Sequence, residues 1–84
     1  MSDHAARLIL TPITHAEYAK LAEKKGPRSG LCTSLALGCP EPARYWQAWK
    51  LPLCAQATRA RPICHVHARR AARAQGVELP KMLI

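Results

Sequence analysis

The pattern of apolar and polar positions predicts a short helix in the N-terminal third of the chain. Thr14-His15-Ala16-Glu17 fits a capping box, in which the Thr hydroxyl accepts a hydrogen bond from a free N–H of the first turn and the Glu reaches back to the cap. Apolar residues then keep to one side, and lysines lie on the other side or in the last turn, where cations suit the helix dipole. Because Gly26-Pro27 is a stop signal, we expect the helix to cover residues 14 to 25.

The pattern after the turn-rich residues 26–30 is typical of strands. We expect an aromatic-rich strand over residues 43–49, a turn or edge at Lys50-Leu51-Pro52, and a second strand over residues 53–63. Pro62 lacks a backbone N–H and would confine that second strand to the edge of a sheet. The segment therefore predicts a two-stranded β-hairpin.

A second helix is predicted from Cys64 to Gln75, a segment that contains no Pro or Gly and is rich in Ala and Arg. Gly76 supplies the usual C-terminal stop. The tail, residues 77–84, ends in apolar side chains that need a surface to cover them, on this molecule or on another.

Composition limits how far a hydrophobic core can stabilise this chain. A chain of 84 residues forms one domain, and it buries only somewhat more than half of the surface that its unfolded form exposes. There is no Phe, the only aromatic residues are two Trp and two Tyr, and much of the apolar fraction is Ala. We therefore expect an additional stabilising element such as disulfides or a metal ion.

The cysteines could supply that element in either of two ways, as disulfides or as metal ligands. The N-terminal residues include Asp3, only a short apolar run and no convincing cleavage site, so we expect a cytoplasmic protein. Thiols stay reduced in that compartment, where clustered cysteines more often bind metal. No apolar run approaches the length that crosses a bilayer, so we expect a soluble protein without membrane contact.

The strongest candidate ligands are Cys64 and His67, because residues three apart share a face of a helix and can point at a common centre. Cys32 and Cys39 would complete a tetrahedral zinc site, with Gly38 able to shape the tight turn beside Cys39. The gap between these two cysteines is wider than the usual spacing of a ligand pair.

Other residues leave alternatives open. Cys54 could replace Cys32 as a ligand, or it could be a small buried apolar residue. His65 faces about 100° away from Cys64 on the helix, and we expect it to be exposed or to support a ligand by hydrogen bonding. His4 and His15 are expected to have no metal role.

The order of a cysteine turn, a hairpin and a helix whose first turn carries the last two ligands resembles the treble-clef zinc fingers. Gly38-Cys39-Pro40-Glu41-Pro42-Ala43 and the segment from Ile63 to Arg70 resemble the GC-x-x-PA and LC-x-x-H-x-R segments of short zinc modules in actinobacterial and phage proteins. The likeness covers residues 32–70. It implies a zinc site and little about function, because treble clefs bind DNA, RNA or protein and also include nucleases.

Pattern, ligands and resemblance together predict a small zinc-stabilised α+β domain. It would comprise an N-terminal arm and helix over residues 1–30, a zinc module over residues 31–76 and the apolar tail over residues 77–84.

The net charge of +8 would attract a polyanion such as nucleic acid, or an acidic protein face. Arg69, Arg70 and Arg73 can share one broad side of the second helix and contact a phosphate backbone, and Arg59 and Arg61 extend this basic cluster. The alternative is a helix face that is merely solvated.

The tryptophans of the hairpin are a second candidate contact. Trp46 and Trp49 are three apart, so in a strand they would fall on opposite faces. One could fill the core while the other is exposed for stacking or for a protein partner.

Two hypotheses for function remain once enzymes are considered. No Ser/His/Asp arrangement, paired carboxylates or phosphate-binding glycine loop can be assembled, and cysteine-rich metal sites are typically closed, so we expect neither catalysis nor a small-molecule substrate. The first hypothesis is a nucleic-acid-binding regulator that uses the arginines. The second is an adaptor or inhibitor that docks on a machine such as RNA polymerase or the ribosome through Trp46, Trp49 and the tail. The charge favours the first.

Overall fold

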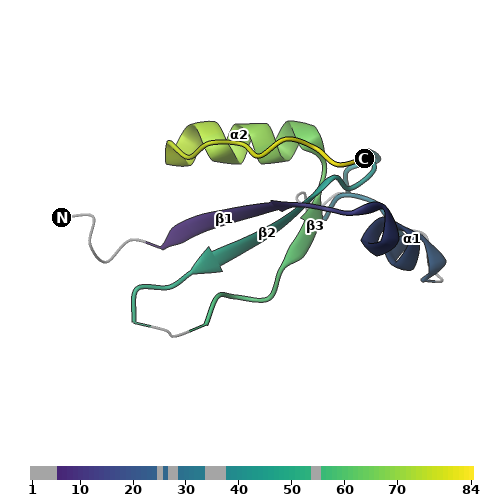
Figure 1. Cartoon of the computed structure of the whole chain (residues 1–84), viewed down its shortest axis with the longest axis horizontal. Helices are drawn as coiled ribbons and strands as arrows, with labels where there is room; N and C mark the ends of the chain where they lie inside the picture. Colours follow the sequence, from purple (N-terminus) through teal and green to yellow (C-terminus); the bar gives the residue numbers. More distant parts are fainter. Residues whose placement is uncertain (1–5, 25, 27–28, 34–37, 54–55) are drawn as a thin grey trace.

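The computed structural model describes residues 6–24, 26, 29–33, 38–53 and 56–84. These residues form a small α+β fold, in which one helix lies along the sheet and the other lies at one end of it (Figure 1). The elements in chain order are β1 (Arg7–Pro12), α1 (His15–Glu23), β2 (Tyr45–Lys50), β3 (Arg61–Ile63) and α2 (His65–Gln75).

The sheet has three antiparallel strands in the order β1-β2-β3, where a two-stranded hairpin was predicted. β1, in the segment predicted as an arm, pairs with β2 along its whole length, from Arg7 opposite Lys50 to Pro12 opposite Tyr45. The hairpin itself is confirmed, with β3 much shorter than the predicted strand. Pro62 lies on an edge strand, as its missing N–H requires.

The capping box of α1 is present. Thr14 Oγ1 accepts a hydrogen bond from the Glu17 amide at 3.1 Å, and Glu17 Oε1 accepts one from the Thr14 amide at 2.9 Å. None of the α1 residues is buried. The helix is attached through Tyr18, whose ring centroid lies 5.3 Å from the Arg44 guanidinium carbon, an arrangement that supports a cation–π interaction.

α2 begins and ends as its sequence predicts. Cys64 is the N-cap residue, and Gly76 follows the last turn with φ of 65°, the left-handed conformation that favours glycine. Ala68 and Ala72, one turn apart, are the buried residues of α2. Their small side chains let the helix approach the sheet closely.

The core lies between α2 and the sheet and includes three cysteines. Its buried cluster comprises Cys32, Cys39, Tyr45, Ile63, Cys64 and Ala68, with Leu10 and Leu79 packed against it. The tail therefore finds part of its cover on this molecule. It runs beside α2 (Figure 1), and the Tyr45 hydroxyl donates a 2.7 Å hydrogen bond to the Pro80 carbonyl oxygen. No helix among the described residues is long and apolar enough to span a membrane.

Candidate metal centre

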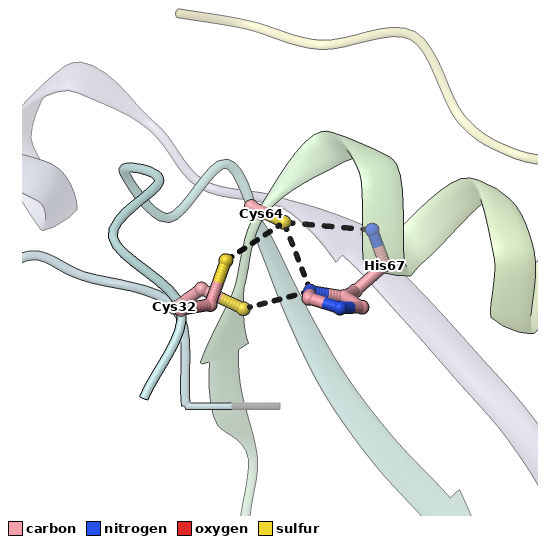
Figure 2. Close-up of side chains that lie close together, drawn as sticks. Cys32, Cys64 and His67 are labelled. Atoms are coloured by element: carbon pink, nitrogen blue, oxygen red, sulfur yellow. Dashed lines mark hydrogen bonds between the residues drawn. The ribbon is translucent and has the colours of Figure 1, made fainter. Parts of the chain in front are cut away.

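Three thiols and one imidazole converge where the loop before β2 meets the start of α2. The donor atoms of Cys32, Cys39, Cys64 and His67 all lie within 4.8 Å of one another. The three cysteines are buried and His67 is half-buried. Figure 2 shows the side chains of Cys32, Cys64 and His67 directed toward one another. These are the four residues predicted as ligands.

The loop half of the centre is held by backbone hydrogen bonds between two short segments. The Cys32 amide donates to the Glu41 carbonyl oxygen at 3.0 Å, and the Ala43 amide donates to the Gly30 carbonyl oxygen at 2.9 Å. Leu31 and Pro42 form an antiparallel bridge between these bonds. This pairing brings the flanks of Cys32 and Cys39 together and explains how cysteines so widely spaced can face one centre.

A further pair of hydrogen bonds fixes this loop to β3. The amide and the hydroxyl of Thr33 both donate to the Pro62 carbonyl oxygen, each at 2.9 Å. Pro62 is two residues from Cys64, so the bonds tie the loop ligands to the strand that leads into the helix ligands. Thr33 could not be predicted from the sequence, because a threonine in a loop carries no signal of its hydrogen-bond partner.

The helix half of the centre occupies a single turn. Cys64 Sγ accepts a hydrogen bond from the His67 amide at 3.5 Å and lies 3.1 Å from His67 Nδ1. The N-cap and the third helical residue therefore present their donor atoms together. Because the cap bond also orients the sulfur, the start of α2 is already shaped as half of a metal site.

The separations between the donor atoms, from 3.1 Å between Cys64 Sγ and His67 Nδ1 to at most 4.8 Å, are close to those around a tetrahedral ion. Cys32 Sγ lies 3.3 Å from His67 Nδ1, and Cys39 Sγ lies 3.9 Å from Cys64 Sγ. Zinc–sulfur and zinc–nitrogen bonds of about 2.3 and 2.0 Å give tetrahedral edges of roughly 3.5–3.8 Å. Three thiols with one imidazole form a donor set typical of closed sites that take four protein ligands and leave no position for water.

Burial sets the protonation of one donor. Burial is the main cause that raises the pKa of the Cys64 thiol to about 11, and the neighbouring Cys32 and Cys39 thiols add to the rise. The His67 amide acts in the opposite direction by donating to the sulfur. A metal ion that binds here must therefore displace a proton from Cys64 at neutral pH.

The other two histidines that the structure describes, His65 and His15, lie outside this group. His65 stacks on Tyr45, with ring centroids 6.1 Å apart and an interplanar angle of 26°. It packs beside the centre without joining the donor set, as its direction on the helix predicts. His15 is exposed at the start of α1. Cys54, the substitute ligand, and His4 fall in segments that the structure does not describe.

The five arginines of the predicted basic cluster do not lie in one place but in two different parts of the structure. Arg69, Arg70 and Arg73 are exposed on α2, within an arc of about 100° that does not include the buried alanines. Arg59 and Arg61 instead line a cavity to which no α2 residue contributes, and Arg61 Nη2 also donates a hydrogen bond to the Thr33 carbonyl oxygen.

Neither tryptophan of β2 fills the core. Both Trp46 and Trp49 are half-buried, and both line the cavity that contains Arg59. Alternation along a strand predicts that these two side chains point to opposite faces of the sheet. However, β3 pairs with β2 only as far as Gln47, so the edge of β2 beside Trp49 is not covered by β3. Beyond that point the chain curls back beside Trp49, whose backbone bonds twice to Thr58.

Comparison with protein-family models, with curated proteins and with solved structures finds no match for this chain.

Proposed function

We propose that this chain is a zinc-stabilised, non-enzymatic regulatory protein that binds nucleic acid. Zinc is the ion that the donor set favours, because thiolates and imidazole at tetrahedral spacing are its usual ligands. Four protein ligands close the site, which suits a structural role and leaves no open position for catalysis. The treble-clef resemblance agrees with the order of the ligands, two before the hairpin and two at the start of α2.

The exposed arginine arc of α2 is the observation that carries the nucleic-acid proposal. Arg69, Arg70 and Arg73 project from one side of a helix that contains no acidic residue. The metal ligands at the start of the same helix hold it in place, so the cations are presented on a rigid support. A duplex backbone attracts such an array without regard to base sequence.

A salt titration tests the proposal. Zinc-loaded protein should bind labelled DNA or RNA at low salt, with an affinity that falls steeply and linearly on logarithmic axes as salt rises. Absence of binding to either polymer at low salt would overturn the proposal.

One observation supports a protein-binding adaptor as the second candidate. Met82 and Leu83 remain 40% and 54% exposed at the end of a tail whose Leu79 packs on the core. Apolar anchors of this kind carry protein interfaces. Capture of a single partner that survives high salt would favour this function, because apolar contacts are not screened.

A further inference from the structure

A solvent-open cavity of about 850 Å³ lies apart from the metal centre. Its walls come from the end of α1, the loop before the metal ligands, β2 and the residues around β3. Pockets that hold small organic ligands have volumes of about 300–1,000 Å³. The four metal ligands and the arginines of α2 do not line this cavity, so it is a separate feature of the molecule.

The walls combine two aromatic residues with three cations. Trp46 and Trp49 are half-buried, which leaves part of each side chain accessible. Lys24, Arg59 and Arg61 line the same cavity, and none of the described lining residues is acidic. Anionic and aromatic character in one ligand would complement this lining.

The three cations differ in whether their side chains already donate a hydrogen bond within the protein. Arg61 donates one bond to the Thr33 carbonyl oxygen, whereas Arg59 and Lys24 are exposed and hold no side-chain hydrogen bond among the described residues. The guanidinium of Arg59 can therefore meet a phosphate in a bidentate manner.

We propose that this cavity holds an unpaired nucleotide of a single-stranded nucleic acid, with the base stacked on a tryptophan and its phosphate beside Arg59 and Lys24. The proposal rests on the nucleic-acid function above and specifies its substrate class. The faces of paired bases are covered by their neighbours, so only an unstacked base can reach the rings. An acidic peptide would satisfy the cations but leave the aromatic faces unused.

Oligodeoxythymidine, which does not pair with itself, and a duplex of equal length are suitable probes at low salt. The single strand should quench tryptophan emission and bind on the order of tenfold more tightly than the duplex, since stacking on an aromatic ring contributes to its binding alone. Arg59→Ala should weaken single-strand binding about fivefold and lower its salt slope by about one, with duplex binding unchanged. Arg7→Ala removes an equal charge from an exposed position at the start of β1 and serves as the matched control.

Substitution of the rings tests stacking directly. Trp49→Leu should reduce single-strand affinity on the order of tenfold, whereas Trp49→Tyr should retain most of it. Should Trp49→Leu fail to fold, the exposed Arg59 still provides the test.

The outcomes separate this inference from the proposed function. Binding of single strand and duplex alike, without quenching and without an effect of Arg59→Ala, overturns the cavity proposal and leaves nucleic-acid binding intact. Failure to bind either polymer overturns both. Quenching by polyglutamate that exceeds quenching by the oligonucleotide assigns the cavity to acidic peptides and also overturns the proposal.

Discussion

The sulfur atoms of Cys39 and Cys64 lie 3.9 Å apart, although 25 residues separate them in the chain. A disulfide requires about 2.05 Å between sulfurs, whereas the edge of a zinc-centred tetrahedron is roughly 3.8 Å. These two residues and Cys32, the cysteines that the structure describes, are all thiols and form no disulfide. The pair is therefore spaced for an ion, and a disulfide would need the two sulfurs to move closer together.

Zinc should be present at one ion per chain in protein purified under reducing conditions. Because the binding energy of a structural zinc is also folding energy, Cys64→Ser should leave the chain largely unfolded. Elemental analysis and far-UV circular dichroism measure the two effects. Cys54→Ser is the control, and it should have only a small effect on folding and zinc content. A folded Cys64→Ser variant together with an unfolded Cys54→Ser variant would show that the ligand set is wrong.

Zinc uptake should release protons and strengthen as pH rises. Cys64 is protonated at neutral pH before metal binds, both in the folded arrangement, where its pKa is raised to about 11, and in an unfolded chain, where a thiol has its ordinary pKa of about 8.5. Its proton must leave when the metal binds, so at least one proton should appear per zinc. Titration calorimetry in buffers of different ionisation enthalpy counts the protons. A zinc affinity that is independent of pH between about 6 and 8 would contradict a thiolate site.

Thr14→Ala should weaken α1 by about 1 kcal/mol, the usual effect of losing an N-cap. In the wild-type protein, the hydrogen bond from the Thr14 amide to the Glu17 carboxylate should weaken at low pH, when the carboxylate is protonated. The pKa of Glu17 is lowered chiefly because its carboxylate accepts the hydrogen bond from the Thr14 amide. A lowered pKa means that the carboxylate stabilises the fold above the ordinary value of about 4.3, and that this contribution is lost as pH falls through the lowered value.

Hydrogen exchange at the backbone amides of α1 measures both expectations, namely faster exchange in Thr14→Ala and faster opening of the wild-type helix in acid than at neutral pH, after correction for the intrinsic pH dependence of exchange. Since α1 buries no residue, zinc stoichiometry should not change in Thr14→Ala. Loss of zinc in this variant would show that α1 is coupled to the metal centre.

The triple variant Arg69→Ala, Arg70→Ala and Arg73→Ala should weaken nucleic-acid binding and reduce the salt slope by about three at most. The helix should remain folded, because Ala is the best helix former and the three positions are exposed. Lysine at the same three positions keeps the charge and is the matched control, which should retain most of the salt slope. Unchanged binding by a folded triple alanine variant would remove α2 as the contact surface.

Tyr45→Phe should destabilise the protein by about 1 kcal/mol, because it removes the hydrogen bond to the Pro80 carbonyl oxygen while keeping the buried ring. The tail should become more accessible to protease near Pro80. Tyr18→Phe, which keeps the ring beside Arg44, is the matched control. Equal protease sensitivity in the two variants would show that the Tyr45 bond does not hold the tail.

Local signals account for the parts of the fold that the sequence predicts. The capping box at Thr14 and the glycine at position 76 each act within one turn of chain, and both helices begin or end where these residues indicate. β1 was not predicted, because its pairing is non-local. Leu8 finds its partner at Trp49 in the distant strand β2, and the apolar run around Leu8 is too short to indicate a strand by itself.

The candidate ligands were predictable because their chemistry is rare and their positions on α2 are regular. The interactions that hold the loop around Cys32 and Cys39 in place follow no such regular spacing. The Leu31–Pro42 bridge and the bonds from Thr33 to Pro62 depend on tertiary approach of segments whose residues have no distinctive spacing. The shared cavity of Trp46 and Trp49 is likewise a product of the short β3, which a propensity argument does not anticipate.

The arrangement of ligands around the hairpin has a consequence for the order of folding. Cys64 and His67 are assembled as soon as the first turn of α2 forms, whereas Cys39 lies 25 positions before Cys64, on the far side of β2 and β3, and must be brought to the site. Closing a loop of that length costs roughly 3 kcal/mol of chain entropy. An ion captured first by the helix would therefore wait for the hairpin. Once metal is abundant, the closing of this loop would limit the rate of reaching the native state, and more metal would not increase that rate.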